Sequence, residues 1–129
     1  MIGDAMARKP VADLESTYRT LLGIIEPYAS TLAVVKKTPR ALYLASKTSK
    51  TQSGSAVWFG GVEIMKNYVS FHLIPVYVDP ALLAELSPAL RKRMQGKSCF
   101  NFTSLDPVQT SELVSLTQKG YERFTRQFP

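Results

Sequence analysis

Histidine and cysteine each occur only once in this sequence, as His72 and Cys99. A single cysteine excludes an internal disulfide, and we therefore expect a reducing, cytoplasmic location. A single histidine excludes most metal sites that are built from several imidazoles. From the residues alone we predict no metal site and no cofactor.

Long apolar runs and catalytic signatures are missing as well. The uncharged stretches are shorter than the roughly 20 apolar residues that a membrane span requires, so we expect no association with membranes. Residues 1–10 lack the apolar segment of a secretory signal. The sequence contains no Gly-rich phosphate loop, no nucleophile elbow and no zinc-protease motif, and we predict no catalytic residue.

The length and composition are those of one globular domain. Of the 129 residues, 45% are hydrophobic and 20% are charged, which is ordinary for such a domain. We expect residues 1–10 to form an N-terminal extension and residues 11–129 to form a single domain.

The net charge of +6 arises from 16 basic and 10 acidic residues. Such an excess is compatible with binding of polyanions but is also common in proteins that bind none. The densest basic patch comprises Arg91, Lys92, Arg93 and Lys97. Three consecutive helical residues point in three directions, so we interpret the patch as a solvated helix end rather than a nucleic-acid interface.

Residues 56–74 predict three short antiparallel strands. Gly60-Gly61 and Lys66-Asn67 would form two tight hairpin loops, because glycine and asparagine tolerate a left-handed backbone. In the resulting register Trp58 lies opposite Glu63. One face of this meander is entirely apolar and is expected to join the core: Val57, Phe59, Val62, Ile64, Val69, Phe71 and Leu73. The other face is mixed: Ala56, Trp58, Glu63, Met65, Tyr68, Ser70 and His72.

The rest of the chain predicts further strands of the same sheet and several helices. The expected order is a helix over 11–25, strands over 31–36 and 41–47, a polar loop over 50–55, short helices after Asp79-Pro80 and Ser87-Pro88 with Gly96 ending the second, a strand over 98–104 and a helix after Asp106-Pro107. Short turns between consecutive strands indicate antiparallel pairing. We therefore predict an α+β fold, an antiparallel sheet with helices packed mainly on one face.

The mixed face is the candidate site, with Trp58, Glu63, Tyr68, Ser70 and His72 as its binding residues. Aromatic and polar groups on one sheet face suit a small ligand or a protein partner. Alternatively, the first helix or the 50–55 loop covers Trp58 and makes a second small core.

His72 and Cys99 each allow two interpretations. In the predicted register His72 is a diagonal neighbour of Glu63, which suits either an acid–base pair in a small enzyme or a local hydrogen bond on the sheet. Cys99 either packs as a small apolar group or is a reactive thiol near Arg93 and Lys97.

Several segments resemble the YdhG-like family of small bacterial proteins. The resemblance runs from about Leu21 to Phe124 and is carried by residues 26–29, 43–48, 58–60, 66–77 and 95–102 and by the C-terminal helix. It implies a frataxin-like sandwich and a role as an iron chaperone. It supplies no iron ligands in this sequence, where Asp13 and Glu15 are the only close acidic pair in the first helix.

We therefore expect a non-enzymatic binding or chaperone-type module, which the resemblance links to iron or iron–sulfur metabolism. The alternatives are a small enzyme with a pocket near Glu63 and His72, and a weak nucleic-acid binder.

Overall fold

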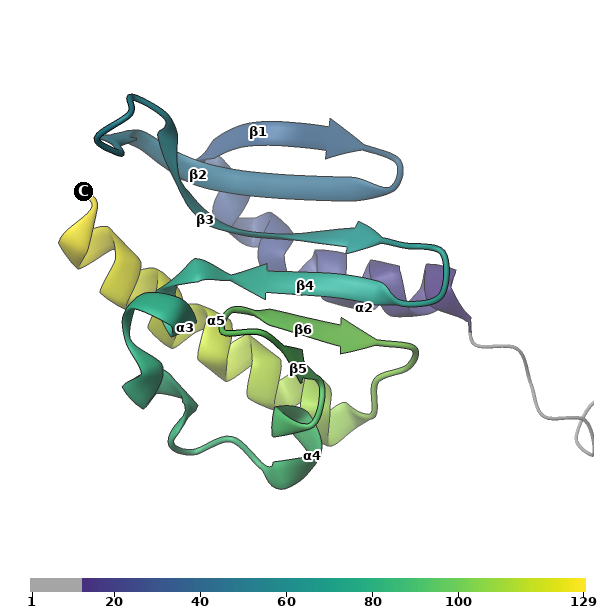
Figure 1. Cartoon of the computed structure of the whole chain (residues 1–129). Coiled ribbons are helices and arrows are strands. Elements are labelled where there is room, and N and C mark those ends of the chain that lie inside the picture. The colour runs from purple at the N-terminus through teal and green to yellow at the C-terminus, as the bar shows by residue number, and fades with distance from the viewer. Residues whose placement is uncertain (1–12) are drawn as a thin grey trace, which may run out of the picture.

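A computed structural model describes residues 13–129, and within them six strands form one antiparallel sheet in the order β1-β2-β3-β4-β6-β5 (Figure 1). The strands are β1 (Ala33–Thr38), β2 (Ala41–Lys50), β3 (Ala56–Ile64), β4 (Val69–Leu73), β5 (Met94–Gln95) and β6 (Cys99–Phe102). The helices are α2 (Leu14–Ile25), η1 (Glu26–Ser30), α3 (Ile74–Val78), η2 (Pro80–Leu83), α4 (Pro88–Arg91) and α5 (Pro107–Gln127).

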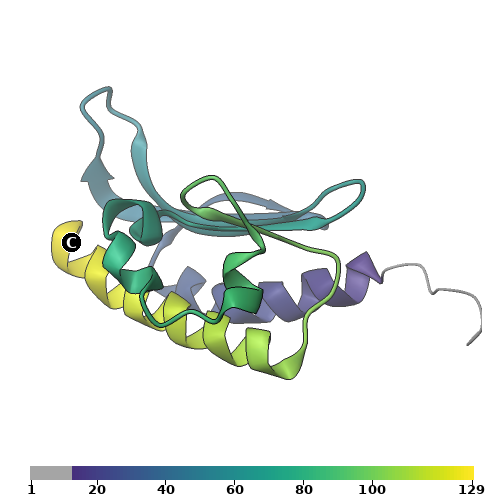
Figure 2. The same ribbon diagram turned by 60° about the horizontal axis from the view of Figure 1, so that its bottom comes forward.

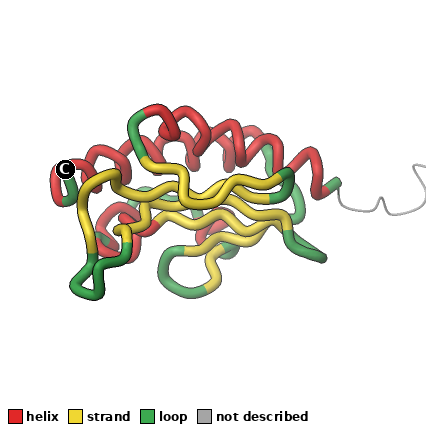
Figure 3. The backbone as a smooth tube through the Cα atoms, turned by 90° about the horizontal axis from the view of Figure 1, so that it is seen from above, coloured by secondary structure: helices red, strands yellow, loops and turns green. Residues whose placement is uncertain are grey.

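The two long helices, α2 and α5, lie side by side on one face of the sheet (Figure 2). Figure 3 shows the same two layers from a third direction, with the strands as a twisted layer beside the long helices. The predicted α+β fold, with helices packed mainly on one face of an antiparallel sheet, is confirmed. The predicted N-terminal extension, residues 1–10, lies outside the described residues.

Both long helices begin at an aspartate whose carboxylate caps the first turn. Asp13 Oδ1 accepts a hydrogen bond from the Ser16 amide at 3.0 Å. Asp106 Oδ1 accepts one from the Gln109 amide at 2.7 Å, and the Gln109 side chain accepts from the Asp106 amide in return. Such caps satisfy amide groups that have no partner within the helix. Sequence-local signals therefore place these helix starts.

The core lies between these helices and the sheet. Of the predicted apolar set, all but Val57 are buried, and Val57 is partly buried. The Phe59 ring meets the Phe124 ring of α5 edge-on, with 5.3 Å between centroids. The pairs Val62 with Phe71 and Ile64 with Val69 are confirmed as register partners.

The predicted hairpin at Gly60-Gly61 is wrong, because β3 passes straight through both glycines. Leu44 of β2 pairs with Gly60 while the next residue, Ala45, pairs with Trp58, so β3 carries one extra residue at this point. This β-bulge lets both Phe59 and Val62 face the core although they are three residues apart. Trp58 lies opposite Ala45 of β2 and not opposite Glu63, because Trp58 and Glu63 belong to the same strand.

The second predicted hairpin loop is confirmed. The Met65 amide donates to the Tyr68 carbonyl at 2.8 Å across Lys66-Asn67. Within residues 13–129 only glycines have a positive φ. Asn67 therefore does not adopt the left-handed conformation that we expected.

Two further details differ from expectation. Gly96 does not end a helix: α4 already ends at Arg91, and Gly96, with a φ of 80°, lies in the turn between β5 and β6. Helix α3 directly follows β4 and was not predicted, because its residues Ile74–Val78 are mostly β-branched or apolar. Throughout residues 13–129, every helix is too short or too polar to span a bilayer.

Candidate functional site

The sheet face turned away from α2 and α5 carries an open pocket of about 350 Å³, here called the outer-face pocket. Strands β1, β2, β3 and β4 and the first residue of α3 all contribute to it. Its lining residues are Lys36, Tyr43, Trp58, Gly60, Glu63, His72 and Ile74.

Three rings meet in this pocket, with Tyr43 in the middle. The Tyr43 ring centroid is 5.1 Å from that of Trp58 and 5.9 Å from that of His72, with tilted planes. Trp58 remains 44% exposed to solvent. The alternative that the first helix or the 50–55 loop covers Trp58 and makes a second small core is therefore wrong.

Gly61 explains how Tyr43 can lie across the sheet. A Cβ atom at position 61 would collide with the Tyr43 ring and would lie only 2.6 Å from the Leu42 carbonyl oxygen. Glycine in a strand interior commonly marks such a close approach, and an aromatic ring from the neighbouring strand can cover it. The glycine thus fixes the position of the central ring.

The Glu63 carboxylate is held by two neighbours. Its Oε1 accepts a hydrogen bond from the Tyr43 hydroxyl at 2.8 Å, and its Oε2 lies 3.7 Å from the Lys36 ammonium. Burial and the hydrogen bond to Glu63 together raise the pKa of Tyr43 well above its ordinary value of 10.0. The phenol therefore stays protonated and donates at neutral pH.

His72 is engaged by a buried neighbour on the same strand. Its Nε2 is 2.8 Å from Ser70 Oγ, and Ser70 is only 5% exposed. Burial lowers the pKa of His72 below 6.5, and the Glu63 carboxylate, the smaller of the two effects, acts in the opposite direction. The imidazole is therefore neutral at neutral pH.

Cys99 belongs to the same group of side chains. Its Sγ lies 3.1 Å from Ser70 Oγ and 3.9 Å from His72 Nε2. The thiol is partly buried. The Lys97 ammonium, one of its two basic neighbours in sequence, lies over the Tyr77 ring instead.

The structure brings together three of the five predicted binding residues, Trp58, Glu63 and His72. Ser70 supports His72 without lining the pocket. Tyr68 is partly buried in the turn just before β4 and is not a lining residue.

Sequence reasoning missed Lys36 and Tyr43, although Tyr43 is central to the site. One signal was available: Tyr43 stands between Leu42 and Leu44, so in a strand with an apolar core face it must point outward. The pairing of Tyr43 with Gly61 and of Lys36 with Tyr43 shows which residues become its neighbours.

Within residues 13–129, the basic residues do not form one continuous surface. Arg91, Lys92, Arg93 and Lys97 are exposed around α4 and β5, whereas Lys36 belongs to β1 at the opposite edge of the sheet. The Arg91 guanidinium donates to the Leu83 carbonyl at 2.6 Å.

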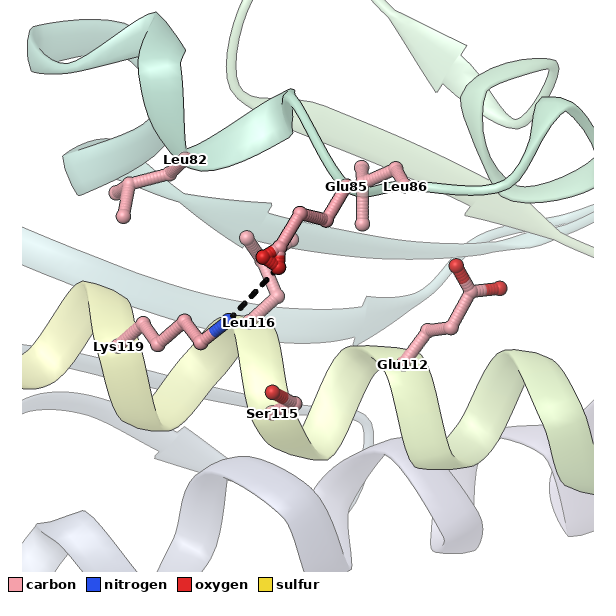
Figure 4. A pocket seen from close by; sticks show the side chains of 7 residues that line it. All are labelled: Leu82, Glu85, Leu86, Glu112, Ser115, Leu116 and Lys119. Atoms are coloured by element: carbon pink, nitrogen blue, oxygen red, sulfur yellow. Dashed lines mark ion pairs between the residues drawn. The ribbon is translucent and has the colours of Figure 1, made fainter.

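Beside α5, two glutamates each have a partner of their own. Figure 4 shows a smaller pocket of about 220 Å³ beside α5, where the Glu85 carboxylate lies 3.6 Å from the Lys119 ammonium. Glu112 in the same pocket accepts hydrogen bonds from the Ser87 amide and hydroxyl at 2.8 and 2.7 Å. Residues 13–129 contain no group of three or more His, Cys, Asp or Glu side chains that could hold a metal ion.

Comparisons with protein-family models, with curated proteins and with solved structures found no match to this chain. The resemblance to the YdhG-like family therefore stays a prediction.

Proposed function

We propose that this chain is a non-enzymatic binding module that holds a small molecule with a flat ring in the outer-face pocket. The observation that carries the proposal is the Trp58 ring, 44% exposed and packed against Tyr43, on a sheet face whose central polar groups hold one another in place. A rigid aromatic surface beside a few oriented polar groups is the usual composition of a recognition site. The single free cysteine supports a reducing, cytoplasmic setting for this activity.

The size of the pocket and the exposed Trp58 ring support a small, flat ligand. Its volume of about 350 Å³ is within the range of small-molecule sites. A flat ring can stack on the exposed side of Trp58, as aromatic pairs do in offset or edge-on arrangements. At the edge of that ring, Lys36 offers a donor and Glu63 an acceptor.

The alternative of a small enzyme at Glu63 and His72 is less well supported. A general base needs a lone pair within reach of the substrate. His72 Nε2 is already engaged with the buried Ser70 hydroxyl at 2.8 Å. The pocket is also open to water, whereas active sites usually exclude it.

A link to iron rests on the family resemblance alone. The carboxylate in the pocket, Glu63, is paired with the Lys36 ammonium, and a second positive charge would be repelled there. The ligand that suits these charges is neutral.

A matched pair of probes tests the proposal, namely benzamide and cyclohexanecarboxamide. Both carry the same amide donor and acceptor, but only benzamide has a flat ring. We expect benzamide to bind more tightly and to shift the NMR signals of the Trp58 indole N–H and the Gly60, Gly61 and His72 amides.

The Trp58→Ala variant should lose this response, whereas Tyr77→Ala, which removes another exposed aromatic ring outside the pocket, should retain it. Equal binding of the two probes, or a Trp58→Ala variant that responds like the wild type, would contradict the proposal.

A further inference from the structure

A second pocket, of about 410 Å³, lies between α3, η2 and the β5–β6 turn and is here called the α3–β5 pocket. Figure 1 shows the β5–β6 turn beside α3, although the two segments are well separated in sequence. The lining residues are Val76, Tyr77, Pro80, Leu83, Met94, Gly96 and Lys97.

The walls of this pocket are apolar with a single charged member. Val76 is buried at its base, while the Tyr77 ring is 56% exposed to solvent. The Lys97 ammonium lies 5.7 Å from the centroid of that ring. Lys97 is thus the one charged side chain among the lining residues.

A second cation, Arg91, is bonded to a residue that lines the pocket. Arg91 donates from one guanidinium nitrogen to the carbonyl of Leu83, a lining residue, at 2.6 Å. This bond uses only part of the five-donor guanidinium group. Its remaining N–H groups can still bind an anion.

Nearby carboxylates do not neutralise this positive charge. Asp79, which follows α3, is paired with Arg123 of α5 at 3.3 Å. Glu85, which follows η2, is paired with Lys119 at 3.6 Å. The pocket therefore combines an apolar interior with the Lys97 cation and with the Arg91 cation that is bonded to its lining residue Leu83.

We propose that the α3–β5 pocket binds a small amphipathic carboxylate from solution, with its apolar chain among Val76, Tyr77, Leu83 and Met94 and its carboxylate on Lys97 and Arg91. Apolar burial would supply most of the affinity, and the charge-assisted contacts at the rim would select the anion over neutral or cationic molecules of the same length. This site is separate from the outer-face pocket and does not depend on the function proposed for it.

Three eight-carbon probes test the proposal by NMR titration: octanoate, octan-1-ol and octyltrimethylammonium. We expect octanoate to bind most tightly, octanol about 25-fold to 100-fold more weakly, and the cation not measurably; the octanol ratio corresponds to the loss of two partly exposed charge contacts, at about fivefold to tenfold each. Octanoate should shift the amides of Val76, Tyr77 and Lys97, and its affinity should fall as salt rises.

Lys97→Gln should weaken octanoate binding about fivefold to tenfold and leave octanol binding unchanged. Lys92→Gln is the matched control, because Lys92 is an exposed lysine of the same basic patch that does not line the pocket. Both lysines are exposed, so neither substitution should impair folding. Trp58→Ala should not alter octanoate binding.

Four results would overturn the proposal: no binding of octanoate at millimolar concentration, equal affinity for octanol and octanoate, equal losses in Lys92→Gln and Lys97→Gln, or shifts confined to the outer-face pocket. Binding only to vesicles that contain phosphatidylglycerol, without binding of free octanoate, would also overturn it and would indicate a lipid surface as the partner.

Discussion

Replacing Gly61 with alanine should destabilise the fold, although alanine loses less backbone conformational entropy on folding than glycine does. The added methyl group would collide with the Tyr43 ring and would crowd the Leu42 carbonyl oxygen at 2.6 Å. Overpacking of this kind typically costs about 1 to 3 kcal/mol. Because the second obstacle is backbone, we expect the loss to lie in the upper half of that range.

Gly23 provides the matched control for this substitution. It lies within α2, and a Cβ atom there would meet nothing within 4 Å. Gly23→Ala should therefore stabilise the protein by about 0.5 to 1 kcal/mol, the usual difference between glycine and alanine in a helix. The two Gly→Ala variants thus have predicted effects of opposite sign.

Urea denaturation of both variants, followed by circular dichroism, measures these free energies of unfolding. Tyr43→Ala should also cost less in the Gly61→Ala background than in the wild type, because the ring that the methyl group meets is then absent. A neutral or stabilising effect of Gly61→Ala would refute the inference that Tyr43 lies across this strand.

Three other predictions concern the core and the outer-face pocket. Phe71→Ala should cost about 3 to 5 kcal/mol in the same urea assay, because its ring is fully buried; a cost below about 1.5 kcal/mol would place Phe71 outside the core. His72 has a lowered pKa, so the folded state favours the neutral imidazole, and its contribution to stability should be complete above about pH 6.5 and should be lost as the pH falls further. The difference in free energy of unfolding between the wild type and His72→Gln should therefore change with pH across that range. Tyr43 has a raised pKa, so its ring carbons, followed by NMR, should show no ionisation at pH 10.0, the ordinary midpoint for tyrosine; half-ionisation there would contradict the hydrogen bond to the Glu63 carboxylate.

Local signals predicted most elements of this fold. Asp106-Pro107 and Ser87-Pro88 specify helix starts because a cap needs only a side chain and an amide a few residues away. Alternation likewise placed Phe71 and Val69 in the core, since a strand has a strict period of two.

The glycines were misinterpreted for a physical reason. A Gly-Gly pair suits a tight turn, but it equally suits a strand that another chain segment approaches closely. Which role applies to Gly60-Gly61 depends on Tyr43 and Leu42, which belong to a distant segment. For Gly96 the predicted conformation was right and the location was wrong. Its positive φ was expected at the end of a helix, but it occurs in the β5–β6 turn.

The site was predictable only in part, because some of its residues come from strands that are distant in sequence. Trp58, Glu63 and His72 share the outward face of two strands, which the hairpin pattern indicates. Lys36 and Tyr43 arrive from β1 and β2, and only the register between β2 and β3 makes them neighbours of Glu63. That register depends on the bulge at Phe59 and Gly60. No pattern of residues in the sequence predicted this bulge.

The most direct test of an open binding face compares two adjacent aromatic residues on opposite sides of β3. Phe59 is fully buried and Trp58 is 44% exposed. In urea denaturation, Phe59→Ala should cost about 3 to 5 kcal/mol and Trp58→Ala no more than about 1.5 kcal/mol. A cost of about 3 kcal/mol or more for Trp58→Ala would show that this ring is part of a second core, and the outer-face pocket would then not be a binding site.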